Sequence, residues 1–271
     1  MKTDKIGKWS ELKLEIIKKY AKAYTRILSN ENWCKGYFYI DAFSGAGFHE
    51  SRNTGELIQG SPINALEIDP AFSEYHFIDL DKGKIGNLKQ LVGEAPNKYF
   101  YNEDCNQVLM KSIFPKLPYN SYKRALCLLD PYGLHLNWET VMKAAELKTM
   151  DVFINFSVMD MNMNVLFDKL EYVTPENINR MNAFWGDDSW KDIIYKVNMN
   201  LFGDEYNKKE ENFTKLGKEY RNRLKKTAGF TFVPEPILMR NKSNGPLYYL
   251  YFASQQKLAD DIINDIFKKY K

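Results

Sequence analysis

The stretch from Tyr37 to Gly47 constrains the fold of this chain more than any other. Its first four residues, 37–40, are aromatic or β-branched, a composition typical of a short buried strand. The strand is followed by Asp41 and then by two glycines, Gly45 and Gly47. Glycine has no Cβ and tolerates positive φ, so such a turn lets backbone N–H groups approach a ligand closely. The stretch therefore predicts a strand that ends at a binding loop, although glycine turns of this kind also occur without a ligand.

Further apolar runs follow this strand, and helical patterns separate them. We expect strands at residues 75–79, 99–102, 125–129 and 151–157. The run at 125–129 is apolar throughout, as expected of a central strand that is buried on both faces of a sheet. Strands that alternate with helices predict a mostly parallel sheet with right-handed crossovers. The expected fold class is therefore α/β, with a Rossmann-like sheet.

The remaining segments are expected to complete a single domain over residues 1–271. An amphipathic helix is predicted within residues 1–30, before the first strand. Residues 159–206 show helical patterns and no clear strand, so we expect a helical insertion after the fifth strand. Residues 230–271 predict an antiparallel C-terminal pair of strands and a closing helix, which brings the sheet to about seven strands.

Acidic side chains lie where the expected strands end. Asp41 and Asp79 end two strands, and Asp104 and Asp130 follow two others. Because open α/β sheets bind ligands at the carboxyl ends of their strands, we expect these side chains to share one edge. Asp79 could accept hydrogen bonds from both hydroxyls of a ribose. Asp104 could accept a hydrogen bond from an adenine amino group, but capping of the next helix explains it equally well.

An acid, a proline and an aromatic residue follow the strand at 125–129, namely Asp130, Pro131 and Tyr132. The carboxylate could accept a hydrogen bond from an amino group while the tyrosine ring stacks on a planar substrate. A structural Asp-Pro turn is the alternative. Residues 48–60 are expected to form a polar loop, either a lid over the site or a plain surface loop, and His49 is a candidate base only in the first case.

Composition excludes some classes of protein and leaves others open. The net charge of +3 indicates no partner by itself, but residues 208–226 carry eight basic against three acidic side chains. Such a stretch could bind phosphates or could be a solvated helix. Cys34, Cys105 and Cys127 are isolated, which fits a reducing cytoplasm and no structural metal site. With no signal-peptide pattern and no long apolar run, we expect a cytoplasmic protein that does not bind membranes.

Together these motifs resemble those of class I S-adenosylmethionine-dependent methyltransferases. The segment 41–47 looks like the first motif of that superfamily, 77–79 its second, 102–105 its adenine-binding segment and 129–132 its catalytic motif. The resemblance implies S-adenosyl-L-methionine as the cofactor and no metal. The cofactor-binding residues that it implies are Asp41, Phe43, Gly45, Gly47, Asp79, Asp104 and Cys105, and the catalytic residues are Asp130, Pro131 and Tyr132.

More narrowly, the chain resembles the bacterial three-Cys-motif partner family, TcmP. The matching features are Lys13-x-x-Ile16-Ile17-x-x-Tyr20, Asp41-Ala42-Phe43-Ser44-Gly45, Gly60-Ser61-Pro62, Leu129-Asp130-Pro131-Tyr132-Gly133-Leu134 and Leu247-Tyr248-Tyr249-Leu250-x-Phe252-Ala253-Ser254. The family is named for its neighbour, a three-cysteine protein that looks like a radical-SAM enzyme, and such a protein is therefore a candidate partner. Methyltransferases of amino groups carry Asp/Asn-Pro-Pro-aromatic, whereas a single proline separates Asp130 from Tyr132 here. Their mechanism therefore does not carry over unaltered.

The function expected from this resemblance is methyl transfer to a nucleophile, first of all a base nitrogen in RNA or DNA. Two alternatives stay open. One is a non-catalytic adaptor that senses the cofactor and acts through the three-cysteine partner, and the other is a methyltransferase of small molecules or proteins. The sequence leaves the substrate and the oligomeric state undetermined.

Overall fold

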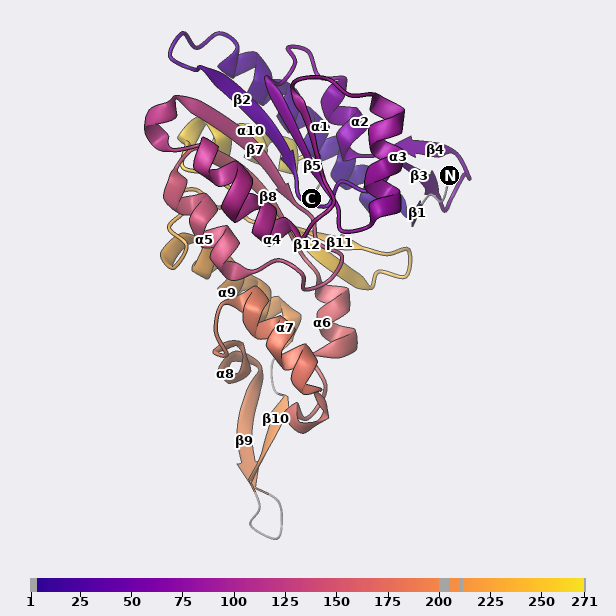
Figure 1. Cartoon of the computed structure of the whole chain (residues 1–271). Coiled ribbons are helices and arrows are strands. Elements are labelled where there is room, and N and C mark those ends of the chain that lie inside the picture. The colour runs from indigo at the N-terminus through magenta and orange to yellow at the C-terminus, as the bar shows by residue number, and fades with distance from the viewer. Residues whose placement is uncertain (1–3, 200–204, 210–211, 271) are drawn as a thin grey trace.

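The structure is a computed structural model that describes residues 4–199, 205–209 and 212–270. Its centre is a seven-stranded sheet in the order β11-β12-β8-β7-β2-β5-β6 (Figure 1). Within this sheet only β12 is reversed, because it pairs antiparallel with both β8 and β11. The expected α/β fold, with a mostly parallel sheet and an antiparallel C-terminal pair, is confirmed. The strands are β2 (Gly36–Asp41), β5 (Glu74–Ile78), β6 (Lys98–Tyr101), β7 (Lys123–Leu129), β8 (Met150–Phe156), β11 (Ile237–Arg240) and β12 (Pro246–Ala253).

Alternate side chains of the central strands pack into two separate cores. In β7, Ala125, Cys127 and Leu129 belong to one hydrophobic cluster. Leu126 and Leu128 belong to the other. Side chains of a strand point alternately to opposite faces, so a strand that is buried on both faces is apolar throughout. The sheet is therefore the middle layer between two layers of helices.

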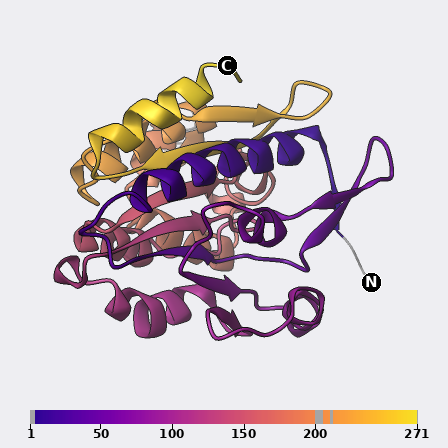
Figure 2. The same ribbon diagram turned by 90° about the horizontal axis from the view of Figure 1, so that it is seen from above.

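One face of the sheet is covered by helices from both ends of the chain. Figure 2 shows α1 and α10 side by side over this face, with the helices that follow β2 and β5 beside them. The predicted N-terminal helix is confirmed as α1, and its residues Ile16, Ile17 and Tyr20 enter this core. The helices on this face are α1 (Lys8–Leu28), α2 (Ser61–Leu66), α3 (Lys82–Val92) and α10 (Lys257–Phe267).

The other face is covered by the helices after β6 and β7 and by the insertion. Before the insertion, this layer consists of α4 (Cys105–Val108), the short helical turns η1 (Leu109–Ile113), η2 (Phe114–Lys116) and η3 (Tyr119–Ser121), and α5 (Trp138–Leu147). The insertion adds α6 (Val158–Asn164), η4 (Leu170–Tyr172), α7 (Pro175–Trp185) and α8 (Trp190–Ile194), and α9 (Phe213–Lys226) follows it.

The expectation of a purely helical insertion over 159–206 is wrong at its end. Strands β9 (Tyr195–Met199) and β10 (Glu205–Lys209) form an antiparallel hairpin that projects away from the sheet (Figure 1). Apolar and polar residues alternate along 195–199, which is the period of a strand rather than of a helix. Residues 200–204, which the prediction also covered, lie outside the described residues.

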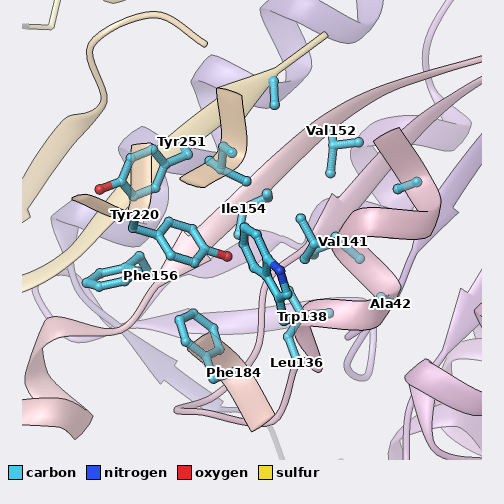
Figure 3. Packing of buried hydrophobic residues seen from close by; sticks show 14 of the residues in the cluster. Ala42, Leu136, Trp138, Val141, Val152, Ile154, Phe156, Phe184, Tyr220 and Tyr251 are labelled. Carbon is cyan, nitrogen blue, oxygen red and sulfur yellow. The ribbon is translucent and has the colours of Figure 1, made fainter. Parts of the chain in front are cut away.

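Aromatic side chains fix the insertion to the sheet. Tyr220 of α9 stacks on Phe184 of α7, with ring centroids 5.5 Å apart and an interplanar angle of 12°. The same tyrosine lies 4.8 Å from Phe156 of β8 and 5.6 Å from Trp138 of α5. Figure 3 shows these rings gathered in one cluster, with Ile154 beside them. Such aromatic pairs contribute about 0.5–1.5 kcal/mol beyond the burial of their area, so the insertion has a defined position on the sheet.

A second, small sheet forms where a loop was predicted over residues 48–60. Strands β1 (Asp4–Ile6), β3 (Phe48–Ser51) and β4 (Leu57–Gln59) make up this sheet, with β1 parallel to β3. The Ser51 hydroxyl donates to Glu11 Oε1 of α1 over 2.8 Å. Backbone pairing and this contact exclude a loose surface loop. Within the described part of the chain, no helix has the length and apolar character needed to span a membrane.

Candidate functional site

The glycine loop after β2 lies against α3 at the carboxyl edge of the sheet. Gly45 has φ of +65° and Gly47 has φ of +93°, values that a residue with a side chain rarely adopts. A Cβ at Gly47 would lie only 3.0 Å from Leu88 Cδ1 and 3.1 Å from Leu91 Cδ2. The fold therefore needs a glycine at position 47, both for the backbone angle and for the close approach to α3.

Asp79 holds this loop from the end of the neighbouring strand. Its Oδ2 accepts from the Gly45 backbone N–H over 2.9 Å, and its Oδ1 accepts from the Asp81 N–H over 2.8 Å. The Asn102 side chain donates to the Asp79 carbonyl over 3.1 Å and so ties the end of β6 to the same place. Asp79 is half-buried, and an ionised carboxylate has about four acceptor positions, so it can still accept from a ligand. The structure brings together the predicted residues Gly45 and Asp79.

Asp41 lies beneath the loop and has no exposed surface. Its carboxyl accepts from the Phe43 N–H and from the Tyr39 hydroxyl, each over 3.3 Å. Burial raises the pKa of Asp41 to about 7, and the charge of Asp130 acts in the same direction. In this conformation Asp41 supports the loop from below, while the half-buried Phe43 lies on the loop itself.

The segment after β6 combines a helix cap with a core cysteine. Asp104 Oδ1 accepts from the Gln107 N–H over 3.1 Å and caps α4, which is the alternative that the sequence left open. Cys105 is 5% exposed and belongs to the hydrophobic core. Burial raises the pKa of its thiol to about 12, so the thiol stays neutral near pH 7. A ligand here would meet the half-buried Asp104 rather than the thiol of Cys105.

Asp130 is paired with a lysine of the N-terminal helix. The Lys13 ammonium of α1 bonds to Asp130 Oδ2, and Asn155 Nδ2 of β8 donates to Asp130 Oδ1 over 2.8 Å. The side chains of Lys13 and Asp130 are only 10% and 21% exposed. The ammonium also lies 5.2 Å from the centroid of the Tyr248 ring. A buried ion pair needs good contacts to offset the cost of desolvating its charges. Asn155 and the Tyr248 ring supply such contacts here.

The loop after Asp130 presents one aromatic ring to solvent. Pro131 is buried, whereas Tyr132 is 88% exposed. The Leu134 N–H donates to Asp160 Oδ2 over 3.1 Å, and Arg180 Nη2 donates to the same oxygen over 2.9 Å. Helices α6 and α7 of the insertion thus hold the loop in place, and the Tyr132 ring is accessible for stacking on a planar group.

His49 lies beside the glycine loop. Its Nε2 would be 3.2 Å from a Cβ at Gly60, and its Cε1 would be 3.9 Å from a Cβ at Gly45. Burial lowers the pKa of His49, whereas the charge of Asp4 raises it. Two buried polar atoms here, His49 Nδ1 and Asn155 Oδ1, have no hydrogen-bond partner among the described residues. Native proteins rarely leave such atoms unpaired, so this edge has the unused bonding capacity expected of a ligand site.

Other features of the chain do not join this cluster. Within residues 4–199, 205–209 and 212–270, no group of three or more His, Cys, Asp or Glu side chains could hold a metal ion. In the basic stretch, Arg221 donates to the Val233 carbonyl and Arg223 to the Trp185 carbonyl. These two arginines therefore serve the fold, and the basic surface is smaller than the sequence count implied. A cavity of about 410 Å³ lies at the opposite, amino edge of the sheet.

Comparison with known proteins identifies no family for this chain. No family model matches the chain. No curated protein matches it. Among solved structures it is similar to protein LPL1258 from Legionella pneumophila str. Philadelphia 1, assigned to the family model DUF519, at 12% identity and a TM-score of 0.45. The match covers 95% of this chain and 92% of that chain. The resemblance to TcmP therefore remains a prediction from motifs, and what is established is a mixed α/β fold with a mostly parallel sheet.

Proposed function

We propose that this chain is an S-adenosylmethionine-dependent methyltransferase that methylates a nitrogen of a nucleic-acid base. The observation that carries the proposal is the placement of two clusters at one edge of the sheet. Asp79 holds the glycine loop at Gly45, and Lys13 and Asn155 hold Asp130 close by. The charge of Asp130 influences both Asp41 and His49, which supports the interpretation of these groups as one site.

The residues at this edge fit the cofactor in three respects. At Gly45 a Cβ would have only His49 Cε1 within 4 Å, at 3.9 Å, so the fold does not fill the space beside the backbone there, whereas at Gly47 α3 fills it. Asp79 is accessible and retains acceptor capacity for a ribose diol, and Asp104 is accessible beyond its capping bond. Asp41, which the motif resemblance implies as a cofactor-binding residue, would act through the loop that it supports. S-adenosylmethionine, when bound, supplies an electrophilic methyl group on its sulfonium.

The chain's own groups would position the nucleophile. Asp130 would accept a hydrogen bond from an amino group of the base, and this contact would orient the nitrogen lone pair. Tyr132, which is exposed, would stack on the plane of the base. As the nitrogen–methyl bond forms, the sulfur–methyl bond breaks, and the proton of the methylated nitrogen leaves to water. Alignment of this kind is worth orders of magnitude in rate.

Lys13 has a defined part in this proposal. It fixes one oxygen of Asp130, Asn155 fixes the other, and the carboxylate can then face a substrate in one orientation. Lys13 is thus a positioning residue, since it would act through Asp130. Its location on α1 explains why the N-terminal helix is part of the site rather than only a cover for the sheet.

The test is transfer of a radiolabelled methyl group from S-adenosylmethionine to single-stranded RNA, single-stranded DNA and a protein extract. We expect label in a nucleic acid and its loss in Asp130→Ala, which removes the acceptor. Lys13→Met should slow transfer roughly 100-fold because the carboxylate loses its orientation. Lys22→Met is the matched control, because Lys22 is exposed on the same helix. Transfer only to protein would contradict the proposed substrate, and cofactor binding without any transfer would favour the adaptor function, acting through a three-cysteine partner.

A further inference from the structure

The cavity of about 410 Å³ lies at the edge of the sheet opposite to Asp41 and Asp130. Arg124 at the start of β7 and Asp151 at the start of β8 line it, together with residues of α1 and α10. Pockets that hold small ligands span about 300–1,000 Å³, so this volume suits a small molecule. The proposed methyltransferase chemistry does not use this edge.

An unsatisfied hydroxyl group lies among the lining residues. Tyr24 is 7% exposed, and its hydroxyl is buried with no hydrogen-bond partner among the described residues. The nearby carboxylate of Asp151 already accepts from the Tyr20 hydroxyl over 2.6 Å and from the Ser254 hydroxyl over 2.5 Å. Burial raises the pKa of Tyr24 well above its ordinary value, so its hydroxyl remains a donor. A ligand with an oxygen or nitrogen acceptor would supply the bond that the protein leaves unmade.

Flat aromatic faces surround the opening. Trp33, Tyr119 and Tyr122 line the cavity and are 41%, 61% and 48% exposed. The Arg124 guanidinium packs 4.5 Å from the Trp33 ring centroid and 5.2 Å from that of Tyr119. Exposed rings beside a packed guanidinium favour a planar ligand that can stack.

The acidic and basic side chains that line the cavity are equal in number, so the cavity does not favour a charged ligand. Glu31 and Asp151 are balanced by Arg124 and Lys148. We propose that this cavity binds an uncharged nucleobase, free or as its nucleoside, with the Tyr24 hydroxyl donating to a base acceptor and the aromatic rim stacking on the base. This site is separate from the proposed methyl-transfer site and does not depend on it.

Calorimetric titration of the full chain with adenosine, guanosine, uridine and cytidine tests the proposal. We expect saturable binding of at least one nucleoside. Tyr24→Phe should weaken it between about 2-fold and about 13-fold, the effect of one hydrogen bond, without lowering the melting temperature. Ile262→Trp, which fills the cavity from α10, should abolish it. Tyr172→Phe removes a hydroxyl from an exposed ring in the insertion and is the control.

The cofactor-site variant Asp79→Ala distinguishes nucleoside binding at the amino edge of the sheet from binding at the carboxyl edge. Nucleoside binding at the amino edge should be unchanged in Asp79→Ala. Binding that disappears in this variant would belong to the carboxyl edge and would overturn the proposal. So would the absence of binding at millimolar nucleoside, or binding that neither Tyr24→Phe nor Ile262→Trp alters.

Discussion

The buried carboxyl of Asp41 gives the most quantitative prediction. Asp41 has no exposed surface, and its partners include the Phe43 N–H and the hydroxyls of Tyr39 and Ser61, none of which carries a charge. Burial raises its pKa in the folded protein to about 7, from the ordinary value of 3.8. Between these two values the folded state holds a proton that the unfolded state has released. The free energy of unfolding must therefore fall as the pH rises through this window.

The magnitude follows from the size of the pKa shift. One pKa unit corresponds to about 1.36 kcal/mol, so the full penalty on the native state above pH 7 is about 4 kcal/mol. Of this, about 2–3 kcal/mol develops between pH 5 and pH 8. In Asp41→Asn the side-chain oxygen can still accept from the Phe43 N–H, and the Tyr39 hydroxyl can turn toward the Ser61 carbonyl, which lies 3.4 Å away. The variant should keep the fold without the titratable group.

Urea unfolding of the wild type and of Asp41→Asn at pH 5, 6, 7 and 8 measures the effect. We expect the variant to gain stability relative to the wild type by about 2–3 kcal/mol across this range. Asp265→Asn, which changes an exposed aspartate in α10, controls for the loss of one negative charge. A difference between wild type and Asp41→Asn that does not change with pH would refute the reasoning, because it would mean that Asp41 is ionised at pH 5 already.

Three further predictions concern the loop, the sheet and the insertion. Gly47→Ala should cost about 2 kcal/mol or more in unfolding free energy, because the new Cβ would contact α3 and the φ angle is unfavourable for alanine. The Cβ of Gly93→Ala would have open space around it, so that variant should cost about 1 kcal/mol. Equal losses would contradict the steric argument. Burial lowers the pKa of His76 to about 3. Lowering the pH from 6.5 to 5 should therefore destabilise the wild type by about 2 kcal/mol relative to His76→Phe in urea unfolding. Unfolding free energies of the two proteins that change in parallel with pH would refute this. Asp160→Ala should speed amide hydrogen exchange at Leu134 roughly tenfold, and unchanged exchange would mean that the insertion does not hold the loop.

The central sheet could be predicted because its strands carry strong local signals. Apolar runs of strand length alternate with helical patterns, and the turn residues fall between them. The weak elements were missed. Strand β1 is three residues long, and its partner residues in β3 lie 45 positions away, so nothing local distinguishes it from a disordered end. The β9 strand was missed for another reason: its alternation was visible in the sequence, but the helical patterns before it were extended through it.

The placement of the candidate residues was predictable in part, but their contacts were not. The pattern of acids at strand ends predicted that Asp79 and Asp130 share one edge, because a parallel sheet brings the carboxyl ends of its strands together. The pairing of Lys13 with Asp130 joins residues 117 positions apart, and only tertiary structure can establish it. One signal was present, since Lys13 lies on the apolar face of α1, three residues before Ile16. The burial of Asp41 was not predictable, because an acid at the end of a strand is usually accessible.

Binding of S-adenosylmethionine to the purified full chain tests the proposed function most directly. We expect micromolar binding of S-adenosylmethionine and of S-adenosylhomocysteine by calorimetry, and its loss in Asp79→Ala. Asp81→Asn is the matched control, because it removes the adjacent charge while asparagine still caps α3. Circular dichroism should show both variants folded. Absence of binding by the folded wild type, or binding that Asp79→Ala leaves intact, would contradict the assignment of the carboxyl edge as the cofactor site.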